Sequence, residues 1–459
     1  MEIVNNSLFT IILAAGKGTR MCSSLPKVLH SIGGRPMIHY VLETAVALQT
    51  EQIALVVNHS QESVIKEAQQ TFSKIIPVIQ EEQLGTAHAV LSARTFIENF
   101  KGIVLVLFGD TPLIRHQTLG EVIDRFSSPS KPAVVVVGMQ LDDPKAYGRI
   151  VTSKDNQVDA IVEHKEADEN IRKIKLCNAG VMALDGVHAI KLLEKILPQE
   201  SNQEYYLTDV VRVARAEGLK AEVVVAQDPS EFEGVNTRKD LAESETKMQE
   251  RWRNKALEQG VTMISPETVY LSYDTKIASD VIIHPFVNLG PNTIIEQDVI
   301  IRSFSDIEDT HIKNGCTIGP FARLRPGTVL EENVKIGNFV EVKNSTLGAK
   351  TKVNHLSYIG DAVVGEKTNI GAGTITCNYD GFSKWQTEIG DGVSIGANTS
   401  LVAPLKIGNQ AYIGAGSTIT KNIAPQSLAV ARAQVKEIEK GAISLRNKKS
   451  TLTYEKDLG

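Results

Sequence analysis

Cysteine is scarce in this 459-residue chain, and its net charge is small. The four cysteines are Cys22, Cys177, Cys316 and Cys377. None of them forms a C-x-x-C pair, so we expect reduced thiols and exclude both a disulfide framework and a zinc site. The formal net charge of −5 is low for this length. It gives no reason to expect nucleic acid or an acidic membrane as a partner.

Long apolar runs are also missing. No run approaches the length of a membrane span, and the opening stretch MEIVNNSLFTIILAAG lacks the basic start and long apolar core of a signal peptide. We therefore expect a cytoplasmic protein with no membrane partner. A hydrophobic content of 42% over 459 residues supports sizeable cores and predicts two or three domains.

The C-terminal half carries an aliphatic residue at every sixth position over long stretches. These residues are Ile312, Ile318, Leu324, Leu330, Ile336 and Val342, and then Ile389, Ile395, Leu401, Ile407, Ile413 and Ile419. A period of six fits neither a helix nor a simple strand. It fits a coil of short flat strands in which one aliphatic side chain per hexapeptide points inward. Three hexapeptides make one triangular turn, which predicts a parallel β-helix.

The repeat can be followed beyond these two stretches. Ile282, Ile294 and Ile300 follow the same six-residue period, so the β-helix is expected to begin near residue 265. Asp306 breaks the apolar series once. We predict slips near 347, at 364, and between 376 and 389. The last slip inserts the sequence CNYDGFSKWQTE, which should project from the coil as a loop.

Residues 8–225 show a different alternation, between apolar runs and helix-like stretches. The runs predicted as buried parallel strands are LFTIILAAG, QIALVVN, GIVLVLFGD and PAVVVVGM. Stretches 36–48 and 61–71 are predicted to be crossover helices. The alternation indicates a Rossmann-like α/β domain with a mostly parallel sheet. Ligands bind beyond the C-terminal ends of such strands, here at Ala14-Ala15-Gly16 and Phe108-Gly109-Asp110.

We divide the chain into an α/β domain at 1–237, a helical linker at 238–260 and a β-helix at 261–459 with a polar tail after 435. The linker is highly charged and has one possible apolar stripe. That stripe consists of Leu241, Met248, Trp252 and Ala256.

The first predicted strand runs into the glycine-rich sequence LAAGKGTRM, followed by SSLPKVL. Such a turn offers backbone N–H groups to phosphate oxygens, and Lys17, Arg20 and Lys27 add positive charge. A Walker A loop is excluded because G-x-x-x-x-G-K-[ST] is absent. A dinucleotide fingerprint is excluded because Met21 occupies the third glycine position. A phosphate-binding loop and a plain strand–helix turn both remain open on these residues alone.

The string L-A-A-G-x-G-T-R-M followed by P-K resembles the signature of sugar-phosphate nucleotidyltransferases. Further motifs follow in order: Gln80, Gln83-Leu84-Gly85-Thr86, Phe108-Gly109-Asp110, Tyr147-Gly148-Arg149, Glu163, Asn178 and Gly234-Val235-Asn236. With the β-helix, this set resembles the GlmU family of bifunctional uridyltransferase and acetyltransferase enzymes over residues 8–435. The resemblance implies a left-handed β-helix, a homotrimer, and UTP and acetyl-CoA as co-substrates.

For the N-terminal half, the resemblance implies uridyl transfer to N-acetylglucosamine 1-phosphate, with Lys27 and Arg20 stabilising charge and Asp110 and Asn236 holding Mg²⁺. The implied nucleotide and sugar contacts are Leu13, Ala14, Ala15, Gly16, Lys27, Gln80, Gly85, Thr86, Phe108, Gly109, Asp110, Gly148, Glu163, Asn178 and Asn236. Taken alone, Asp110 could equally be a turn or cap residue, and Glu163 would be read as part of a solvated charge run. Phe108 stands where the family has tyrosine, so any phenol hydroxyl contact is in doubt.

For the C-terminal half, the resemblance implies acetylation of glucosamine 1-phosphate, with His355 as the general base. Its substrate contacts would be Arg325, Glu341, Lys343, Tyr358 and Asn369, with Glu341 orienting either the base or the sugar. The acetyl-CoA path would be lined by Ala372, Asn378, Tyr379, Ala397, Ala415 and Arg432. Taken alone, His355 would be read as a structural surface histidine. Ala397 stands where a serine is expected near the thioester, so a backbone N–H or another group must serve there.

Two other functions fit parts of the sequence. One is a single-activity nucleotidyltransferase whose β-helix serves only to form trimers; His355 and the CNYDG loop argue against it. The other is a sugar-nucleotide sensor without catalysis. Lys27, Asp110 and Asn236 argue against a sensor, which has no need of metal and leaving-group charges.

Overall fold

The computed structural model describes residues 7–72, 74–153, 157–200 and 203–447, which belong to two compact units. Unit 1 comprises Met1–Lys255 with Leu271–Tyr273, and unit 2 comprises Ala256–Tyr270 with Asp274–Gly459. The boundary at 255 falls within helix α9 (Arg238–Glu258), where the sequence predicts a long helix. Of the predicted polar tail, the part from 448 to 459 lies outside the described residues.

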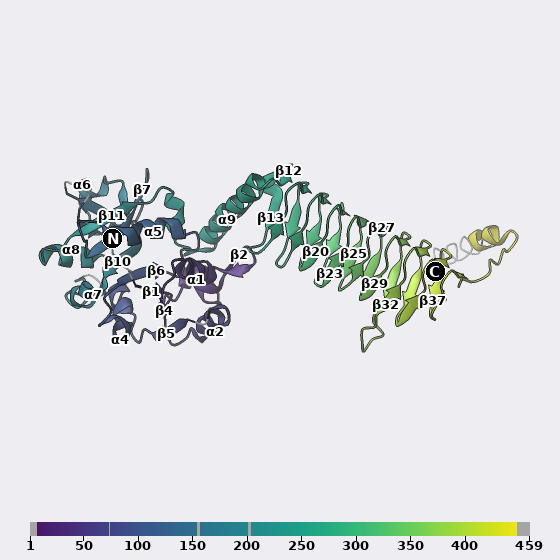
Figure 1. The fold of residues 1–459 in the computed structure, drawn as a ribbon, viewed down its shortest axis with the longest axis horizontal. Coiled ribbons are helices and arrows are strands. Elements are labelled where there is room, and N and C mark those ends of the chain that lie inside the picture. The colour runs from purple at the N-terminus through teal and green to yellow at the C-terminus, as the bar shows by residue number, and fades with distance from the viewer. Residues whose placement is uncertain (1–6, 73, 154–156, 201–202, 448–459) are drawn as a thin grey trace, which may run out of the picture. The chain divides into compact units, whose positions relative to one another are not determined.

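A mixed, mostly parallel sheet forms the centre of unit 1 (Figure 1). Its strands run in the order β11-β7-β10-β6-β1-β4-β5, and β8 joins through β10 with β9 beside it. Their bounds are β1 Leu8–Leu13, β4 Gln52–Val57, β5 Ile75–Ile79, β6 Ile103–Phe108, β7 Val134–Gln140, β8 Arg149–Thr152, β9 Val158–Val162, β10 Leu176–Asp185 and β11 Ala221–Val225. β10 is antiparallel to both of its long neighbours, β6 and β7. The four apolar runs predicted as strands are confirmed as β1, β4, β6 and β7.

Helices cover both faces of this sheet. The helix bounds are α1 Met37–Ala47, α2 Glu62–Thr71, α3 Thr86–Leu91, α4 Arg94–Ile97, α5 His116–Asp124, α6 Glu169–Arg172, α7 Gly186–Leu193 and α8 Asp209–Ala216, and a small hairpin is formed by β2 Ser31–Ile32 and β3 Arg35–Pro36. Of these helices, α1, α2 and α5 lie on one face of the sheet and α3, α4, α7 and α8 on the other. The two crossover helices predicted at 36–48 and 61–71 are confirmed as α1 and α2.

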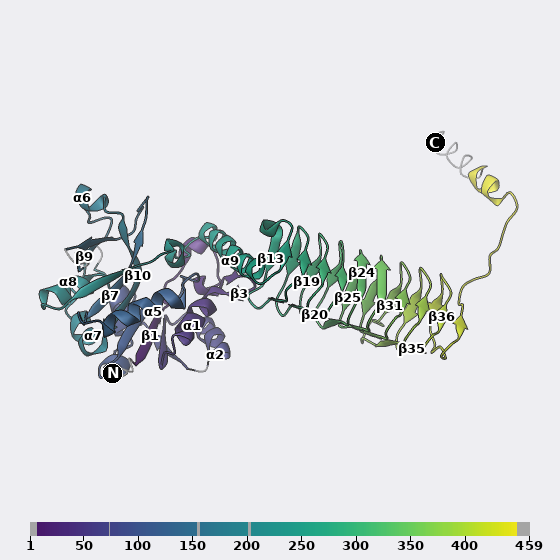
Figure 2. The same ribbon diagram turned by 45° about the horizontal axis from the view of Figure 1, so that its top comes forward.

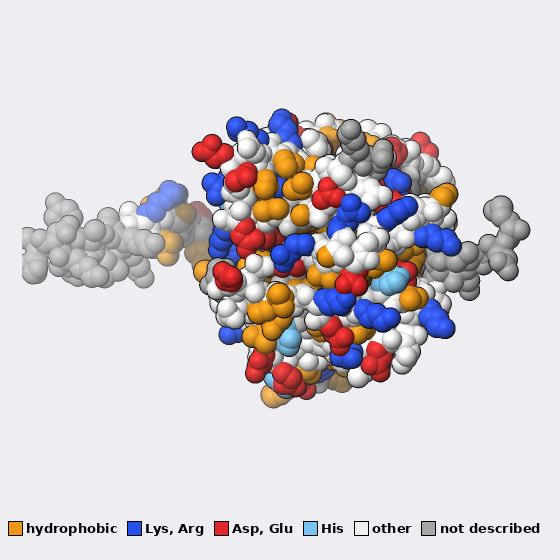
Figure 3. All heavy atoms as spheres, turned by 90° about the vertical axis from the view of Figure 1, so that its left-hand side faces the viewer, with side chains coloured by type: hydrophobic (Ala, Val, Ile, Leu, Met, Phe, Trp, Pro, Cys, Tyr) orange, Lys and Arg blue, Asp and Glu red, His pale blue; other side chains and the backbone are white. Residues whose placement is uncertain are grey.

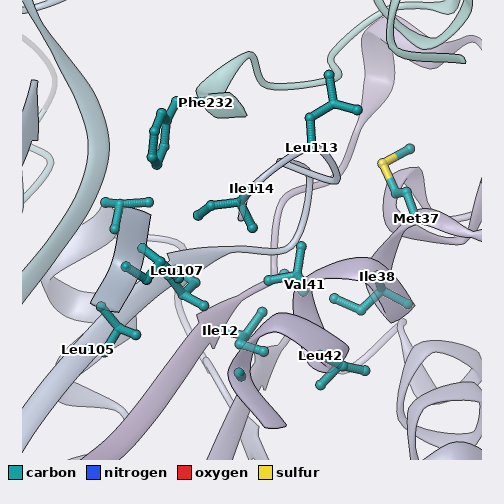
Figure 4. Close-up of a cluster of buried hydrophobic side chains, with 14 of the residues drawn as sticks. Ile12, Met37, Ile38, Val41, Leu42, Leu105, Leu107, Leu113, Ile114 and Phe232 are labelled. Carbon is teal, nitrogen blue, oxygen red and sulfur yellow. The ribbon is translucent and has the colours of Figure 1, made fainter. Parts of the chain in front are cut away.

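The core of unit 1 has two parts, because alternate residues of a strand point to opposite faces. Ile12 of β1 packs with residues of α1, whereas Ile11 packs on the face covered by α3, α4, α7 and α8. Figure 4 shows the first part, in which Val41 and Leu42 of α1 lie near Ile12. Fully burying each of these side chains contributes roughly 1.5–3 kcal/mol, so the sheet and its strand ends are held firmly.

Three sheets of short parallel strands form unit 2 (Figures 1 and 2). Each strand from β12 to β34 pairs with the third strand after it along the chain, and β36 pairs with β38 at the end, so each complete turn passes once through each sheet. The prediction of three hexapeptides per turn is therefore confirmed.

The first of these sheets contains β12 Thr262–Met263, β15 Ile282–Ile283, β18 Ile300–Ile301, β21 Thr317–Ile318, β24 Lys335–Asn338, β27 Lys352–His355, β30 Asn369–Ile370, β33 Ser394–Ile395, β36 Tyr412–Ile413 and β38 Leu428–Ala429. The second contains β13 Val269–Leu271, β16 Val287–Leu289, β19 Asp306–Ile307, β22 Arg323–Leu324, β25 Glu341–Lys343, β28 Tyr358–Gly360, β31 Ile375–Cys377, β34 Ser400–Val402 and β37 Thr418–Ile419. The third contains β14 Lys276–Ile277, β17 Ile294–Ile295, β20 Thr310–Ile312, β23 Thr328–Leu330, β26 Thr346–Leu347, β29 Ala362–Val364, β32 Thr387–Ile389 and β35 Leu405–Ile407.

All twelve aliphatic residues that define the repeat point into the coil, each at most 3% exposed. The predicted slips are also confirmed: the inward positions step from Val342 to Leu347, from Ile359 to Val364, and from Thr376 to Ile389. Residues 379–386 of the inserted sequence are exposed, as expected for a projecting loop.

The predicted register before residue 310 is wrong by one residue. Ile282 and Ile294 are 36% and 38% exposed, whereas their neighbours Ile283 and Ile295 are at most 2% exposed. The inward series continues to Ile307 and then takes a five-residue step to Ile312. Asp306 therefore occupies an outward position and does not interrupt the core. Three positions offer two adjacent isoleucines, and the prediction followed the first of each pair, although the register one residue later also replaces the polar Asn288 and Asp306 with Leu289 and Ile307.

Three further features concern membrane-spanning helices, the cysteines and the surface charge. Within the described ranges, none of the helices has both the length and the apolar character that a membrane crossing requires. The four cysteines are free, as predicted, and Cys22 is the exposed one among them. The face drawn in Figure 3 intersperses lysine and arginine with aspartate and glutamate.

Candidate functional site

Two adjacent strand ends build the first candidate site, in unit 1. β1 and β6 are parallel neighbours with Leu13 opposite Phe108. The N–H of Gly109 donates to the carbonyl of Leu13 at 2.9 Å. The sequences Ala14-Ala15-Gly16 and Gly109-Asp110 therefore lie side by side at the C-terminal edge of the sheet, where ligands bind in such folds.

The glycine-rich loop after β1 is fixed by side-chain amides. Asn58 and Gln83 both donate to the carbonyl of Ala15, at 2.7 and 2.6 Å. Gly18 has a φ of +61°, and a Cβ there would lie 2.8 Å from the Cβ of Lys27. Only glycine combines this conformation with so close an approach, so Gly18 sets the path that brings Lys27 next to the loop.

Four of the predicted residues form one charged cluster beyond these strand ends. The Lys27 ammonium group makes an ion pair with Asp110 and donates to Oδ1 of Asn236 at 3.1 Å. Arg20 donates to the same Asn236 oxygen at 2.9 Å. Lys27 and Asp110 are mostly buried, with side chains 13% and 18% exposed. The structure thus brings together both predicted catalytic cations and both predicted metal ligands.

Asn236 is held by the start of helix α9. The carboxylate of Asp240 accepts from the N–H groups of Asn236 and Thr237 at 2.9 and 2.8 Å, and the N–H of Asp240 donates to the Thr237 hydroxyl at 3.2 Å. This reciprocal pair is a capping box. Burial opposes ionisation of Asp240, but the two N–H bonds outweigh it and lower the pKa of that carboxyl. The sequence analysis missed Asp240, although the Thr-x-x-Asp spacing before a charged helix could have indicated it.

A cavity of about 370 Å³ adjoins the loop and contains most of the predicted nucleotide contacts. Its lining consists of Leu13, Ala14, Ala15, Gly16, Lys27, Val28, Gln80, Gln83, Gly85, Thr86, Ala89, Phe108, Asp110, Glu204 and Tyr206. Gln80 donates to the carbonyl of Gly85 at 3.3 Å. Gly85 has a φ of +106°, and a Cβ there would lie 2.5 Å from the Tyr205 carbonyl. Glu204 and Tyr206 were not predicted; both belong to the polar and aromatic stretch EYYLTD.

A second cavity, of about 480 Å³, contains the predicted sugar contacts. Its lining consists of Phe108, Asp110, Thr111, Lys145, Ala146, Tyr147, Gly148, Glu163, Asn178, Ala179, Gly180, Phe232, Gly234 and Asn236. Phe108 and Asp110 line both cavities. Asp110 therefore lies where the two cavities adjoin each other.

The polar groups of this second cavity are preorganised. The N–H of Asn178 donates to the carbonyl of Gly148 at 2.8 Å, which fixes these two predicted contacts against each other. Burial raises the pKa of Glu163, and a hydrogen bond from Thr208 at 3.3 Å partly offsets that rise. Phe108 packs against Gly180, where a Cβ would lie 3.2 Å from its ring.

The donor set at Asp110 and Asn236 fits a magnesium ion. Both side chains offer oxygens to the same Lys27 ammonium group, so these oxygens lie close together. Mg²⁺ commonly binds one or two protein carboxylates and takes its other ligands from phosphates and water. The described residues contain no group of three or more His, Cys, Asp or Glu side chains placed to hold a metal. An ion here would therefore take its remaining ligands from phosphate oxygens and water.

The second candidate site lies on unit 2, around His355 at the end of β27. Its ring is exposed, and Nδ1 lies 2.8 Å from Oδ1 of Asn338. Glu341 does not contact His355; it accepts from Arg325 at 2.8 Å, and this bond raises the pKa of the Arg325 guanidinium. Of the two roles considered for Glu341, the structure disfavours orientation of the base.

Residues of the predicted acetyl-CoA path occupy the same corner position as His355 in the coils that follow it. Gly373 N–H donates to the carbonyl of His355, Asn398 N–H to that of Ala372, and Gly416 N–H to that of Ala397. Arg432 donates to the carbonyl of Ala415 at 3.0 Å. Ala372, Ala397 and Ala415 thus follow His355 coil by coil, which leaves a strip of small side chains beside the base.

Positive charge gathers on the neighbouring sheet. Arg325 follows β22, and Lys343 ends β25, the next strand of that sheet. Lys384, in the projecting loop, lies so close to Lys343 that the pKa of Lys384 is lowered. Two adjacent ammonium groups attract an anion. The sequence analysis missed Lys384, because an isolated lysine in an irregular loop has no pattern.

A buried carboxylate connects the loop to the coil. Asp361, 9% exposed, accepts from Asn344 at 2.6 Å and from the Asn378 amide. Asn378 also lies 3.4 Å from the hydroxyl of Tyr358. Two predicted contacts, Tyr358 and Asn378, are therefore brought together by a residue that the sequence analysis did not single out. Asn369 lies apart from this cluster on β30, opposite Lys352 of β27.

The projecting loop is internally ordered. Asp380 accepts from the N–H groups of Phe382 and Ser383 and from the Trp385 indole at 2.6 Å. These bonds lower the pKa of Asp380 to about 2. Tyr379, a predicted acetyl-CoA contact, is 62% exposed on this loop.

Comparisons with known proteins agree with the two-part fold. Residues 9–244 match the nucleotidyl transferase family model, residues 306–401 match the GMPPB C-terminal domain model, and residues 386–421 match the bacterial transferase hexapeptide model of six repeats. A protein of Paramagnetospirillum magneticum with the name bifunctional protein GlmU is 46% identical over 99% of this chain and 100% of its own length. A protein of the same name from Bradyrhizobium sp. is 49% identical over 96% of this chain and 98% of its own. One from Xanthobacter autotrophicus is 48% identical over 94% and 95%.

Proposed function

The chain belongs to the family of bifunctional GlmU proteins, and we propose on that basis that it makes UDP-N-acetylglucosamine by two transfers at two sites. Unit 2 acetylates glucosamine 1-phosphate from acetyl-CoA. Unit 1 then transfers UMP from UTP to the N-acetylglucosamine 1-phosphate formed, releasing pyrophosphate. The observation that carries the proposal is that each unit has its own cluster of reactive groups, Lys27 with Asp110 and Asn236 in one and His355 with Asn338 in the other.

In unit 1 the phosphate of the sugar attacks the α-phosphorus of UTP, and pyrophosphate departs. Such transfers depend mainly on alignment and on neutralising charge. The two cavities that share Phe108 and Asp110 suit a nucleotide on one side and a sugar phosphate on the other. Lys27 and Arg20 would offset charge on the triphosphate. Asn178, Gly148 and Glu163 would bind the sugar, and Gln80, Gly85 and Thr86 the uracil.

We propose Mg²⁺ as the cofactor of this transfer, held by Asp110 and Asn236. When bound it would neutralise phosphate charge. The ion pair of Asp110 with Lys27 keeps the carboxylate in place for the ion and the ammonium group in place for the phosphates.

In unit 2 the amine of the sugar attacks the thioester carbonyl, so a C–N bond forms and the C–S bond breaks. His355 would take the amine proton, which finally reaches the departing thiolate of coenzyme A. Arg325, Lys343 and Lys384 would bind the sugar phosphate, and Tyr358 and Asn369 the sugar. Asn378, Tyr379 and Arg432 would bind acetyl-CoA along the strip of Ala372, Ala397 and Ala415.

Ala397 gives the thioester oxygen no hydroxyl donor. The N–H groups of Asn398 and Gly416 are already bonded to the carbonyls of Ala372 and Ala397, which leaves them poorly suited to replace it. Losing one such donor can cost on the order of 3 kcal/mol in the transition state. Replacing Ala397 with serine should therefore raise kcat for acetyl transfer.

We further propose that the chain works as a homotrimer, with acetyl transfer sites near the contacts between copies. A stack of half-exposed phenylalanines on the His355 corner of unit 2 supports this. These are Phe286, Phe304, Phe321 and Phe339, which we call the phenylalanine ladder; its rings are 4.9–5.2 Å apart and 45–56% exposed. A continuous apolar edge of this kind suits burial against another copy.

Mass spectrometry of reaction mixtures tests the proposed function. With glucosamine 1-phosphate and acetyl-CoA alone, we expect N-acetylglucosamine 1-phosphate and free coenzyme A. Adding UTP and Mg²⁺ should yield UDP-N-acetylglucosamine and pyrophosphate. If the nucleotide sugar forms only when N-acetylglucosamine 1-phosphate is supplied ready-made, the β-helix is a scaffold and the acetyltransferase proposal is wrong.

A further inference from the structure

Two strands in the first sheet of unit 2 are longer than the others. β24 (Lys335–Asn338) and β27 (Lys352–His355) have four residues each, and every other strand of that sheet has two. The extra length carries their pairing to the corner of the coil, where Asn338 lies directly opposite His355. The sheet is therefore locally extended at the one place where these two side chains meet.

A glycine lies at the closest approach of these two strands. At Gly337, a Cβ would lie 1.8 Å from the backbone carbonyl oxygen of Asn354. Every other amino acid would push the two strands apart just before Asn338 and His355. The sequence Gly337-Asn338 thus encodes both the close approach of the strands and the polar group that results from it.

The backbone of His355 is fixed from the C-terminal side. Its carbonyl accepts from the hydroxyl of Ser357 at 2.8 Å and from the N–H of Gly373 at 3.3 Å. The ring itself is exposed, and the bond between its Nδ1 and the side chain of Asn338 sets its rotation. An exposed imidazole without such a bond would sample several rotamers.

The same bond selects a tautomer. The Asn338 atom that faces the ring is Oδ1. An amide oxygen only accepts hydrogen bonds, and from this we infer the tautomer in which Nδ1 carries the proton. A neutral imidazole protonated on Nδ1 presents the lone pair of Nε2 outward. That is the form a general base requires if it is to take a proton from an incoming amine.

We propose that Asn338 is a positioning residue for acetyl transfer: it holds the His355 ring in one orientation and in the tautomer whose Nε2 accepts the proton of the substrate amine. The inference rests on the proposed role of His355 as the base. Beyond that role, we infer that the group bonded to Nδ1 of His355 is a neutral amide and not a carboxylate. A neutral partner leaves the imidazole uncharged over a wider range of pH than a carboxylate would.

Kinetics of acetyl transfer by the full chain, from about pH 5 to 9, test this with four variants. Asn338→Ala removes the bond, and Asn338→Asp replaces the amide with a carboxylate. Asn333→Asp adds the same charge on the same coil two residues before β24, and His355→Ala removes the base. Uridyl transfer by each variant reports whether the chain has folded.

We expect Asn338→Ala to lower kcat about tenfold or more, the usual cost of losing a group that orients a reactive imidazole, with KM for glucosamine 1-phosphate within about twofold. Asn338→Asp should recover much of that kcat at high pH, but with its half-maximal rate moved to higher pH, because a carboxylate favours the protonated ring. Asn333→Asp should keep the profile of the parent chain. A merely structural role for Asn338 would not move the pH profile in this way.

Two results would overturn the inference. In the first, Asn338→Ala has the kcat of the parent chain at every pH while His355→Ala is inactive; this result rejects the positioning role of Asn338 and keeps His355 as the base. In the second, the pH profile of Asn338→Asp matches that of Asn333→Asp; this result rejects the positioning role even if Asn338→Ala fails to fold. Full activity of His355→Ala would instead reject the base itself, and the positioning role with it.

Discussion

In the proposed mechanism, single side chains at the C-terminal end of β6 govern the chemistry of unit 1. Asp110 lines both cavities and pairs with Lys27, so its charge serves two needs at once. It is the proposed ligand for a cation, and its ion pair holds the ammonium group of Lys27, which we propose binds the phosphates. Removing it should therefore affect uridyl transfer far more than it affects the fold.

We predict that Asp110→Ala and Asp110→Asn lower kcat for uridyl transfer by more than about 100-fold, the scale typical of losing one electrostatic contact in a transition state. Acetyl transfer by the same variants should stay within about twofold of that of the parent chain. Pyrophosphate release and coenzyme A release, measured on one preparation, check both statements. Near-normal uridyl transfer with Mg²⁺ would show that the metal assignment is wrong.

In both units, motifs pointed to single candidate residues, whereas the contacts between residues could not be predicted from them. Lys27, Asp110 and Asn236 were found because each lies in a motif at a strand end or a helix start, and the sheet brings those ends together. Asp240, Asn338 and Lys384 were missed. Their importance depends on which neighbour each one meets, and that is decided by a cap, by an extended strand pair and by an irregular loop.

At the scale of elements, the hexapeptide period predicted the β-helix but not its full register. The period identifies a core residue only until the chain takes a five-residue step, as it does between Ile307 and Ile312. Before that step, paired isoleucines made two registers possible, but the register through Ile283 fits the sequence better, because it places Leu289 and Ile307 inward in place of Asn288 and Asp306. The packing of successive coils, which involves residues far apart in the chain, selects that register.

The corrected register predicts a difference between two adjacent residues of β15. Ile283→Ala should lower the free energy of unfolding by roughly 2–5 kcal/mol, because it leaves a cavity in the coil. Ile282→Ala should cost under about 1 kcal/mol, because that side chain is already 36% exposed. Urea unfolding of unit 2, followed by circular dichroism, measures both. The opposite order would restore the original register.

The capping box at the start of α9 also gives a testable expectation. Asp240→Ala should cost about 1 kcal/mol of stability near neutral pH and should lower uridyl transfer, because the backbone of Asn236 loses a partner. The folded pKa of Asp240 lies below its unfolded value. Its contribution is therefore complete above about pH 4 and is lost as the pH falls through the lower folded value.

Unfolding of the parent chain, Asp240→Ala and Asp240→Asn, compared near neutral pH and at about pH 3, measures this contribution. Asparagine keeps an acceptor for the cap, so Asp240→Asn should retain most of the stability without the dependence on pH. Equal stability of the parent chain and Asp240→Ala at both values would contradict a capping role.

At the scale of the whole molecule, the proposed trimer predicts a native mass three times that of the chain. Glutamate at both Phe321 and Phe339 should weaken assembly, because it places charge in the phenylalanine ladder. Acetyl transfer should fall with assembly, whereas uridyl transfer should persist. Glutamate at Ile294, an outward residue of another sheet, serves as the control. A monomeric parent chain with full acetyl transfer would contradict the proposal.

The central claim is that two independent sites share one chain and exchange a free intermediate. Mixing Asp110→Ala with His355→Ala tests it most directly, with glucosamine 1-phosphate, acetyl-CoA, UTP and Mg²⁺ as reactants. We predict that neither variant alone forms UDP-N-acetylglucosamine and that the mixture does, because each supplies the step that the other lacks. If the mixture stays inactive although each variant retains its own single reaction, the two sites do not work as separate catalysts and the claim is wrong.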